Sequence, residues 1–114
     1  MSPAPLIDQE LRAAEIAWNV GNEGKARVCA RRAVALATTL WLARLAEPPW
    51  HGDAMEHLRG IQRHPSFPLS VRQAAERLST AVTKRHAAPF TVNPISDANI
   101  IIAHLAADTS HTGL

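Results

Sequence analysis

Apolar residues recur along this chain at steps of three and four, the spacing of an amphipathic helix. The longest such stretch runs from Gly21 to Leu45 and is rich in alanine. Its wide apolar face carries Ala26, Cys29, Ala33, Leu36, Ala37, Leu40 and Ala43. A flanking apolar strip consists of Val28, Ala35 and Leu42, and the opposite side carries Arg27, Arg31 and Thr38. Because the helix has two adjoining apolar surfaces and alanine permits close approach, we predict that it is central and has more than one neighbour.

Further periodic segments, separated by helix-breaking residues, predict the remaining helices. They are residues 6–20, a short helix after the capping residue Asp53, residues 69–85, and a last helix that begins at Ser96 or Asp97. Gly21 and several prolines interrupt the pattern between them. The predicted fold is all-α, an up-and-down bundle of four main helices plus one short helix. It forms a single domain over residues 1–114, with a core from about residue 6 to residue 107.

The composition is only mildly basic, since 12 Lys and Arg residues against 10 Asp and Glu residues give a formal net charge of +2. Such a charge neither requires nor excludes a nucleic-acid partner. The single cysteine, Cys29, falls on the predicted buried face, which is typical of a small core residue in a reducing cytoplasm. No apolar run reaches the length that spans a membrane, and residues 1–5 lack the basic start of a secretory signal. We expect a cytoplasmic protein without membrane association.

Association of two copies is expected, because a chain of 114 residues buries only a modest core. The predicted homodimer interface consists of Val28, Ala35, Trp41 and Leu42. Trp41 lies at the margin of the core face, so it is the best single candidate for an interface hot spot. The last helix is the alternative surface for the dimer.

Basic residues near the start of the central helix are candidates for ligand binding. Lys25, Arg27 and Arg31 lie where a phosphate or an acidic partner would be favoured, and the alternative is that they form a solvated face. The histidines and acidic residues between positions 51 and 64 include one pair at a helical ligand spacing, Asp53 with His57. We therefore expect no metal site and no cofactor.

The order of these elements resembles the HEPN domain (higher eukaryotes and prokaryotes nucleotide-binding domain). The residues that carry the resemblance are the alanine-rich helix, His51-Gly52-Asp53 with Met55-Glu56-His57-Leu58, Lys84-Arg85-His86 before Pro89, and Pro94-Ile95-Ser96-Asp97-Ala98. The resemblance implies a dimerising helical bundle. It also implies a role as a nucleotide- or RNA-binding module, as the partner of a nucleotidyltransferase in a toxin–antitoxin pair, or as a metal-independent ribonuclease. It adds Arg85 and His86 to the candidate ligand-binding residues.

The ribonuclease branch of that family carries an arginine, four to six intervening residues, and a histidine. Arg59 and His64 match this spacing here, with the arginine expected to hold a phosphate and the histidine to move a proton. The family places its pair later in the bundle. We therefore predict a non-catalytic HEPN-like binding module that acts with a protein partner or a nucleotide or RNA. The alternatives are a metal-independent endoribonuclease that uses Arg59 and His64, and a helical repeat-like adaptor suggested by the hairpin from Ala14 to Leu40.

Overall fold

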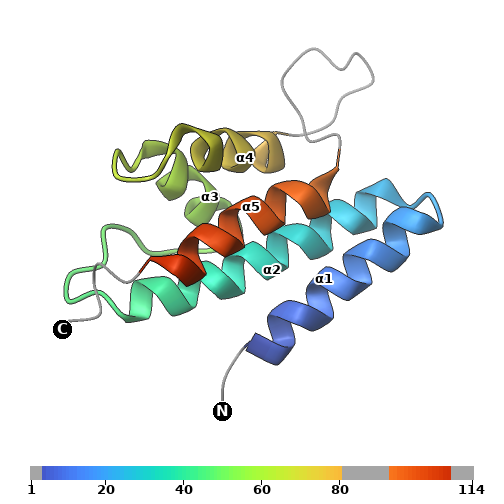
Figure 1. Ribbon diagram of the computed structural model, residues 1–114, viewed down its shortest axis with the longest axis horizontal. Helices are drawn as coiled ribbons and strands as arrows, with labels where there is room; N and C mark the ends of the chain where they lie inside the picture. Colours follow the sequence, from blue (N-terminus) through green and yellow to red (C-terminus); the bar gives the residue numbers. More distant parts are fainter. Residues whose placement is uncertain (1–3, 81–92, 109–114) are drawn as a thin grey trace.

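The computed structural model describes residues 4–80 and 93–108, and these residues form five helices and no strand (Figure 1). The helices are α1 (Ala4–Asn19), α2 (Glu23–Ala43), α3 (Ala54–Arg63), α4 (Leu69–Ser79) and α5 (Pro94–Ala107). Helix α2 runs through the middle and packs against α1, α3 and α5, while α4 packs against α3 and α5. The predicted all-α fold and the central position of the alanine-rich helix are confirmed. None of the described helices has the length and hydropathy needed to cross a membrane.

The hairpin between α1 and α2 forms as its sequence predicts. Gly21 adopts a left-handed backbone with φ of 81°, which an L side chain would disfavour. The amide nitrogens of Gly21 and Asn22 donate to the carbonyl oxygens of Trp18 and Ala17, at 3.1 and 2.8 Å, and so end α1. The Asn22 side chain then accepts from the Lys25 amide at 3.1 Å and caps α2. A joint this short holds α1 antiparallel to α2.

Several helix boundaries differ from the prediction, and α1 begins at Ala4, two residues before its predicted start at residue 6. Helix α5 begins at Pro94 rather than at Ser96 or Asp97, because the Asn93 side chain caps it by accepting from the amides of Ile95 and Ser96. The predicted fourth helix does not continue unbroken to Arg85: α4 ends at Ser79, and Thr80 has an extended backbone. The hydroxyls of Ser79 and Thr80 both donate to the Glu76 carbonyl, so side chains occupy this acceptor at the end of the helix. Residues 81–85 lie outside the described part of the chain.

The buried face of α2 is rotated from the predicted one. Thr38, expected on the polar side, is fully buried, and its hydroxyl donates to the Val34 carbonyl at 2.7 Å. Leu40 and Ala43, expected in the core, are exposed, with Leu40 at 36%. The residues that α2 buries are Ala26, Cys29, Ala30, Ala33, Val34, Ala37, Thr38, Trp41 and Leu42. Contacts with the three helices α1, α3 and α5 explain this wider face, which a one-sided projection does not anticipate.

An ion pair joins α4 and α5, and its carboxylate is almost completely buried. The Arg77 guanidinium donates to Asp97, with Nη2 2.8 Å from Oδ1 and Nε 3.1 and 3.2 Å from the two carboxylate oxygens. The Asp97 side chain is 7% exposed and the Arg77 side chain 33%. The hydrogen bonds that Arg77 donates to Asp97 raise the pKa of Arg77 above its ordinary value. The pair therefore fixes the start of α5 against the end of α4.

Candidate binding groove

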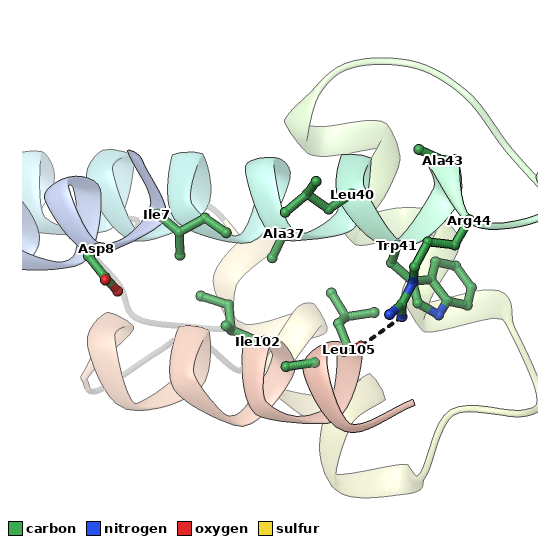
Figure 2. A pocket seen from close by; sticks show the side chains of 10 residues that line it. Ile7, Asp8, Ala37, Leu40, Trp41, Ala43, Arg44, Ile102 and Leu105 are labelled. Carbon is green, nitrogen blue, oxygen red and sulfur yellow. Dashed lines mark hydrogen bonds between the residues drawn. The ribbon is translucent and has the colours of Figure 1, made fainter. Parts of the chain in front are cut away.

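A groove of about 540 Å³ lies between α1, α2 and α5 (Figure 2). Its lining residues are Ile7, Asp8, Ala37, Leu40, Trp41, Ala43, Arg44, Ile102, Leu105 and Ala106. Helix α2 supplies one side and α5 the other, and α1 contributes at one end. The groove exists because α1 packs mainly on α2 and makes few contacts with α5.

Buried apolar side chains form the bottom of the groove, and partly exposed residues form its edges. Trp41 and Leu105 are each 2% exposed, and Ala37 is 7% exposed, so these residues belong to the core as well as to the groove. Leu40 is exposed along the α2 edge, and Ile102 is half-buried on the α5 side. A volume of this size with a mostly apolar lining is typical of a binding site.

The two ends of the groove carry opposite charges. In Figure 2, Asp8 stands at one end and Arg44 at the other, with the apolar side chains between them. Nη2 of Arg44 donates to the carbonyl oxygens of Leu105 and Asp108 at 3.2 and 2.9 Å, so the end of α5 holds the guanidinium in place. Trp41 Nε1 donates to the Asp108 carboxylate at 2.8 Å and fixes the same corner. The groove is thus an apolar surface with the Asp8 carboxylate at one end and the Arg44 guanidinium at the other, where the Asp108 carboxylate bound by Trp41 also lies.

The two residues of the predicted catalytic pair, Arg59 and His64, contact different partners. Arg59 is exposed on α3 and forms an ion pair with Glu56 at 2.7 Å. His64 follows α3 as its capping residue, contacts the rings of Trp41, Trp50 and Phe67, and shares a hydrogen bond with Ser66. Neither residue lines the groove.

The basic candidates lie apart from the groove. Lys25 is exposed at the start of α2, where its amide takes part in the helix cap. Arg31 donates Nε to the Leu78 carbonyl at 2.7 Å and so closes the end of α4. Burial lowers the pKa of Arg31, and the positive charge of Arg27 lowers it further by a smaller amount. Arg85 and His86 lie outside the described residues.

The predicted dimer-interface residues are divided between the surface and the core. Val28 is 42% exposed, and Ala35 is half-buried. Trp41 and Leu42 are 2% and 7% exposed, because α2 turns this part of its surface toward the interior of the protomer. These two side chains therefore offer almost no area to a second chain. Cys29 is buried, as its place on the apolar face predicts.

A buried hydrogen-bonded histidine next to α2 was not anticipated from the sequence. His57 on α3 is 5% exposed, accepts at Nδ1 from Trp50 Nε1 at 3.0 Å, and contacts the Thr39 hydroxyl through Nε2 at 3.3 Å. Because indole nitrogen only donates, Nδ1 carries no proton here, and the neutral ring carries its proton on Nε2. This chain of contacts ties the segment before α3 to both α3 and α2. The available sequence signal was Gly60, since a glycine inside a helix often marks a close approach.

Protein stability is expected to fall when the pH drops below about 6.5, through His57. Burial lowers the pKa of His57 from 6.5, and the nearby Asp53 charge opposes this only in part. The unfolded chain therefore binds this proton more readily than the folded chain does. The stability contributed by neutral His57 is complete above pH 6.5 and is lost as the pH falls from there toward the folded pKa. Thermal unfolding followed by circular dichroism at about pH 7 and about pH 5 measures this loss, and a His57→Gln variant should show a shallower dependence. Equal pH dependence in the two proteins would contradict the assignment to His57.

Among the described residues, no three His, Cys, Asp or Glu side chains gather in an arrangement that would hold a metal ion. The chain matches no protein-family model, no curated protein and no solved structure. Function must therefore be inferred from the groove and from the side chains around it.

Proposed function

We propose that this protein is a non-catalytic helical binding module that acts with a protein partner, and that the groove between α1, α2 and α5 receives apolar side chains of that partner. The observation that carries the proposal is the apolar groove itself. Buried core residues form its bottom, and its edges are accessible. The seven steps from Ala37 in α2 to its capping residue Arg44 rise about 10 Å, which is two helical turns. A groove of this length suits the two or three apolar side chains that an amphipathic helix presents along one face.

The groove's lining favours a protein partner over a nucleotide or RNA. Its cation is Arg44 alone, and Arg44 already donates to two backbone carbonyls. A nucleic-acid surface instead relies on several cations that track the phosphates. Arg31 is engaged with Leu78, away from the groove. The relation to HEPN domains is part of the same proposal, and it rests on the resemblance in the order of the helices that the sequence predicts.

The alternative function, a metal-independent endoribonuclease, receives less support within one protomer. Such chemistry needs an arginine and a histidine directed at one phosphate. Arg59 is paired with Glu56, whereas His64 is packed among aromatic rings. Each is therefore accounted for by a contact within the fold.

Photo-cross-linking in the cells of origin tests the binding proposal. A cross-linking amino acid at position 40 is expected to give an adduct with a protein chain, whereas one at Leu69, an exposed apolar position outside the groove, is not. Addition of Ile102→Glu should reduce the adduct about tenfold or more, because it places a charge in the apolar groove. Equal yields at positions 40 and 69, or an adduct unaffected by Ile102→Glu, would contradict the proposal. RNA cleavage by the purified protein that is lost on Arg59→Ala would contradict its non-catalytic character.

A further inference from the structure

We infer that the protein chain received by the groove is a second copy of this chain, bound about a two-fold axis that places Asp8 of each copy against Arg44 of the other. This inference rests on the proposed function and names the partner. It locates the interface on α1, α2 and α5, rather than on the strip of Val28, Ala35 and Leu42.

The charges at the ends of the groove are the first reason. A two-fold axis that crosses the middle of the groove at right angles to its length exchanges the two ends. The carboxylate end of one copy then meets the guanidinium end of the other. Asp8 and Arg44 occupy those ends, with only apolar and alanine residues between them (Figure 2). Both side chains are exposed. The two-fold dimer therefore contains two favourable contacts between Asp8 and Arg44. If both ends of the groove carried the same charge, the same dimer would bring like charges together.

The shape of the edges is the second reason. Leu40 is exposed on the α2 edge beside a hollow that is lined by apolar side chains. Ala43 and Ala106 are also exposed at the groove, and their small side chains allow two backbones to come close. The same surface thus provides a protruding apolar side chain and a place to receive one. Self-complementarity of this kind is what a two-fold interface requires.

The flanks of the groove must take part as well. A stable interface buries about 800 Å² on each partner, more than ten lining residues provide. The remaining area has to come from exposed residues of α1, α2 and α5 that flank the lining residues along these helices.

Sedimentation equilibrium of the whole chain tests the inference. The natural protein is expected to be dimeric at micromolar concentration. Leu40→Glu should raise the dimer dissociation constant at least about a hundredfold, because each dimer contains the substitution twice. Ile16→Glu is the matched control: Ile16 is an apolar residue of α1 with 61% exposure that lies outside the groove, and its substitution should leave the dimer unchanged.

Charge exchange tests the proposed pairing directly. Asp8→Arg and Arg44→Asp should each weaken the dimer about tenfold, and the double variant should return to within about threefold of the natural protein. Thermal unfolding controls for the loss of the Arg44 hydrogen bonds to α5. If the Arg44→Asp variant does not fold, the Asp8→Arg variant alone tests the pairing. Asp8 is exposed, so its substitution should leave the fold intact.

Four results would overturn the inference: a monomeric natural protein, a dimer insensitive to Leu40→Glu, dissociation by Ile16→Glu, or a properly folded double variant as weak as the single ones. A monomer whose position-40 adduct with another protein still depends on Ile102 would remove the second copy as partner and leave the proposed function standing. A monomer without any such adduct would remove both.

Discussion

Replacement of Arg77 by methionine is expected to lower the free energy of unfolding by about 3 kcal/mol. The substitution leaves the carboxylate of Asp97, which is 7% exposed, buried between α4 and α5 without its cation. An uncompensated buried charge is costly because neither water nor a partner solvates it. The reverse change, Asp97→Asn, should cost only about 1 kcal/mol, because the amide oxygen still accepts from Arg77 and the partly exposed guanidinium reaches water. Urea unfolding of the three proteins measures both values.

The chain contains a matched control for this prediction. Arg59 and Glu56 form an ion pair of similar length, 2.7 Å, but each side chain is about half exposed. Arg59→Met should therefore change the free energy of unfolding by less than about 0.5 kcal/mol. Equal losses from Arg77→Met and Arg59→Met would show that burial of Asp97 does not determine the effect.

Replacement of Gly60 by alanine is expected to destabilise the protein by about 2–3 kcal/mol. In an open helix the same change stabilises, since alanine has the higher helix propensity. At Gly60, however, a Cβ atom would clash with the Trp50 indole, which lies against α3 and donates to His57. The rigid ring must move, and its packing against Trp41 and its hydrogen bond to His57 are then disturbed. Urea unfolding, with near-ultraviolet circular dichroism for the tryptophan environment, measures both consequences.

Two controls isolate the contact with Trp50. Gly24 lies in α2, and a Cβ atom there meets nothing within 4 Å, so Gly24→Ala should be neutral or slightly stabilising. In a Trp50→Ala background, Gly60→Ala should lose most of its cost, because the clash is gone. A destabilisation of the same size with and without Trp50 would contradict the proposed contact.

Local features of the fold could be predicted because short-range chemistry determines them. The helix break at Gly21 and the cap at Asp53 form as predicted, and these features and the cap at Asn22 each depend on residues within one helical turn. The all-α class follows from the spacing of apolar residues. The central position of α2 follows from its two adjoining apolar surfaces.

The features that escaped prediction depend on contacts between distant segments. Arg77 and Asp97 are 20 residues apart, and each alone is typical of a solvated helix position. Trp50 follows two prolines in an irregular segment, and nothing nearby in sequence indicates that its ring lies on Gly60. The rotation of the α2 face, which exposes Leu40 and buries Thr38, follows from how three helices contact it. The groove could not be predicted for the same reason, since its lining is assembled from three helices.

The double use of Trp41 limits how this protein can change during evolution. Its indole belongs to the core and to the bottom of the groove at once, so a substitution that alters the bottom also weakens the fold. Leu40, Ala43, Ile102 and Ala106 are less constrained, because they are partly or fully exposed. Divergent descendants that acquire new partners are therefore expected to differ at these four edge positions while they retain the tryptophan.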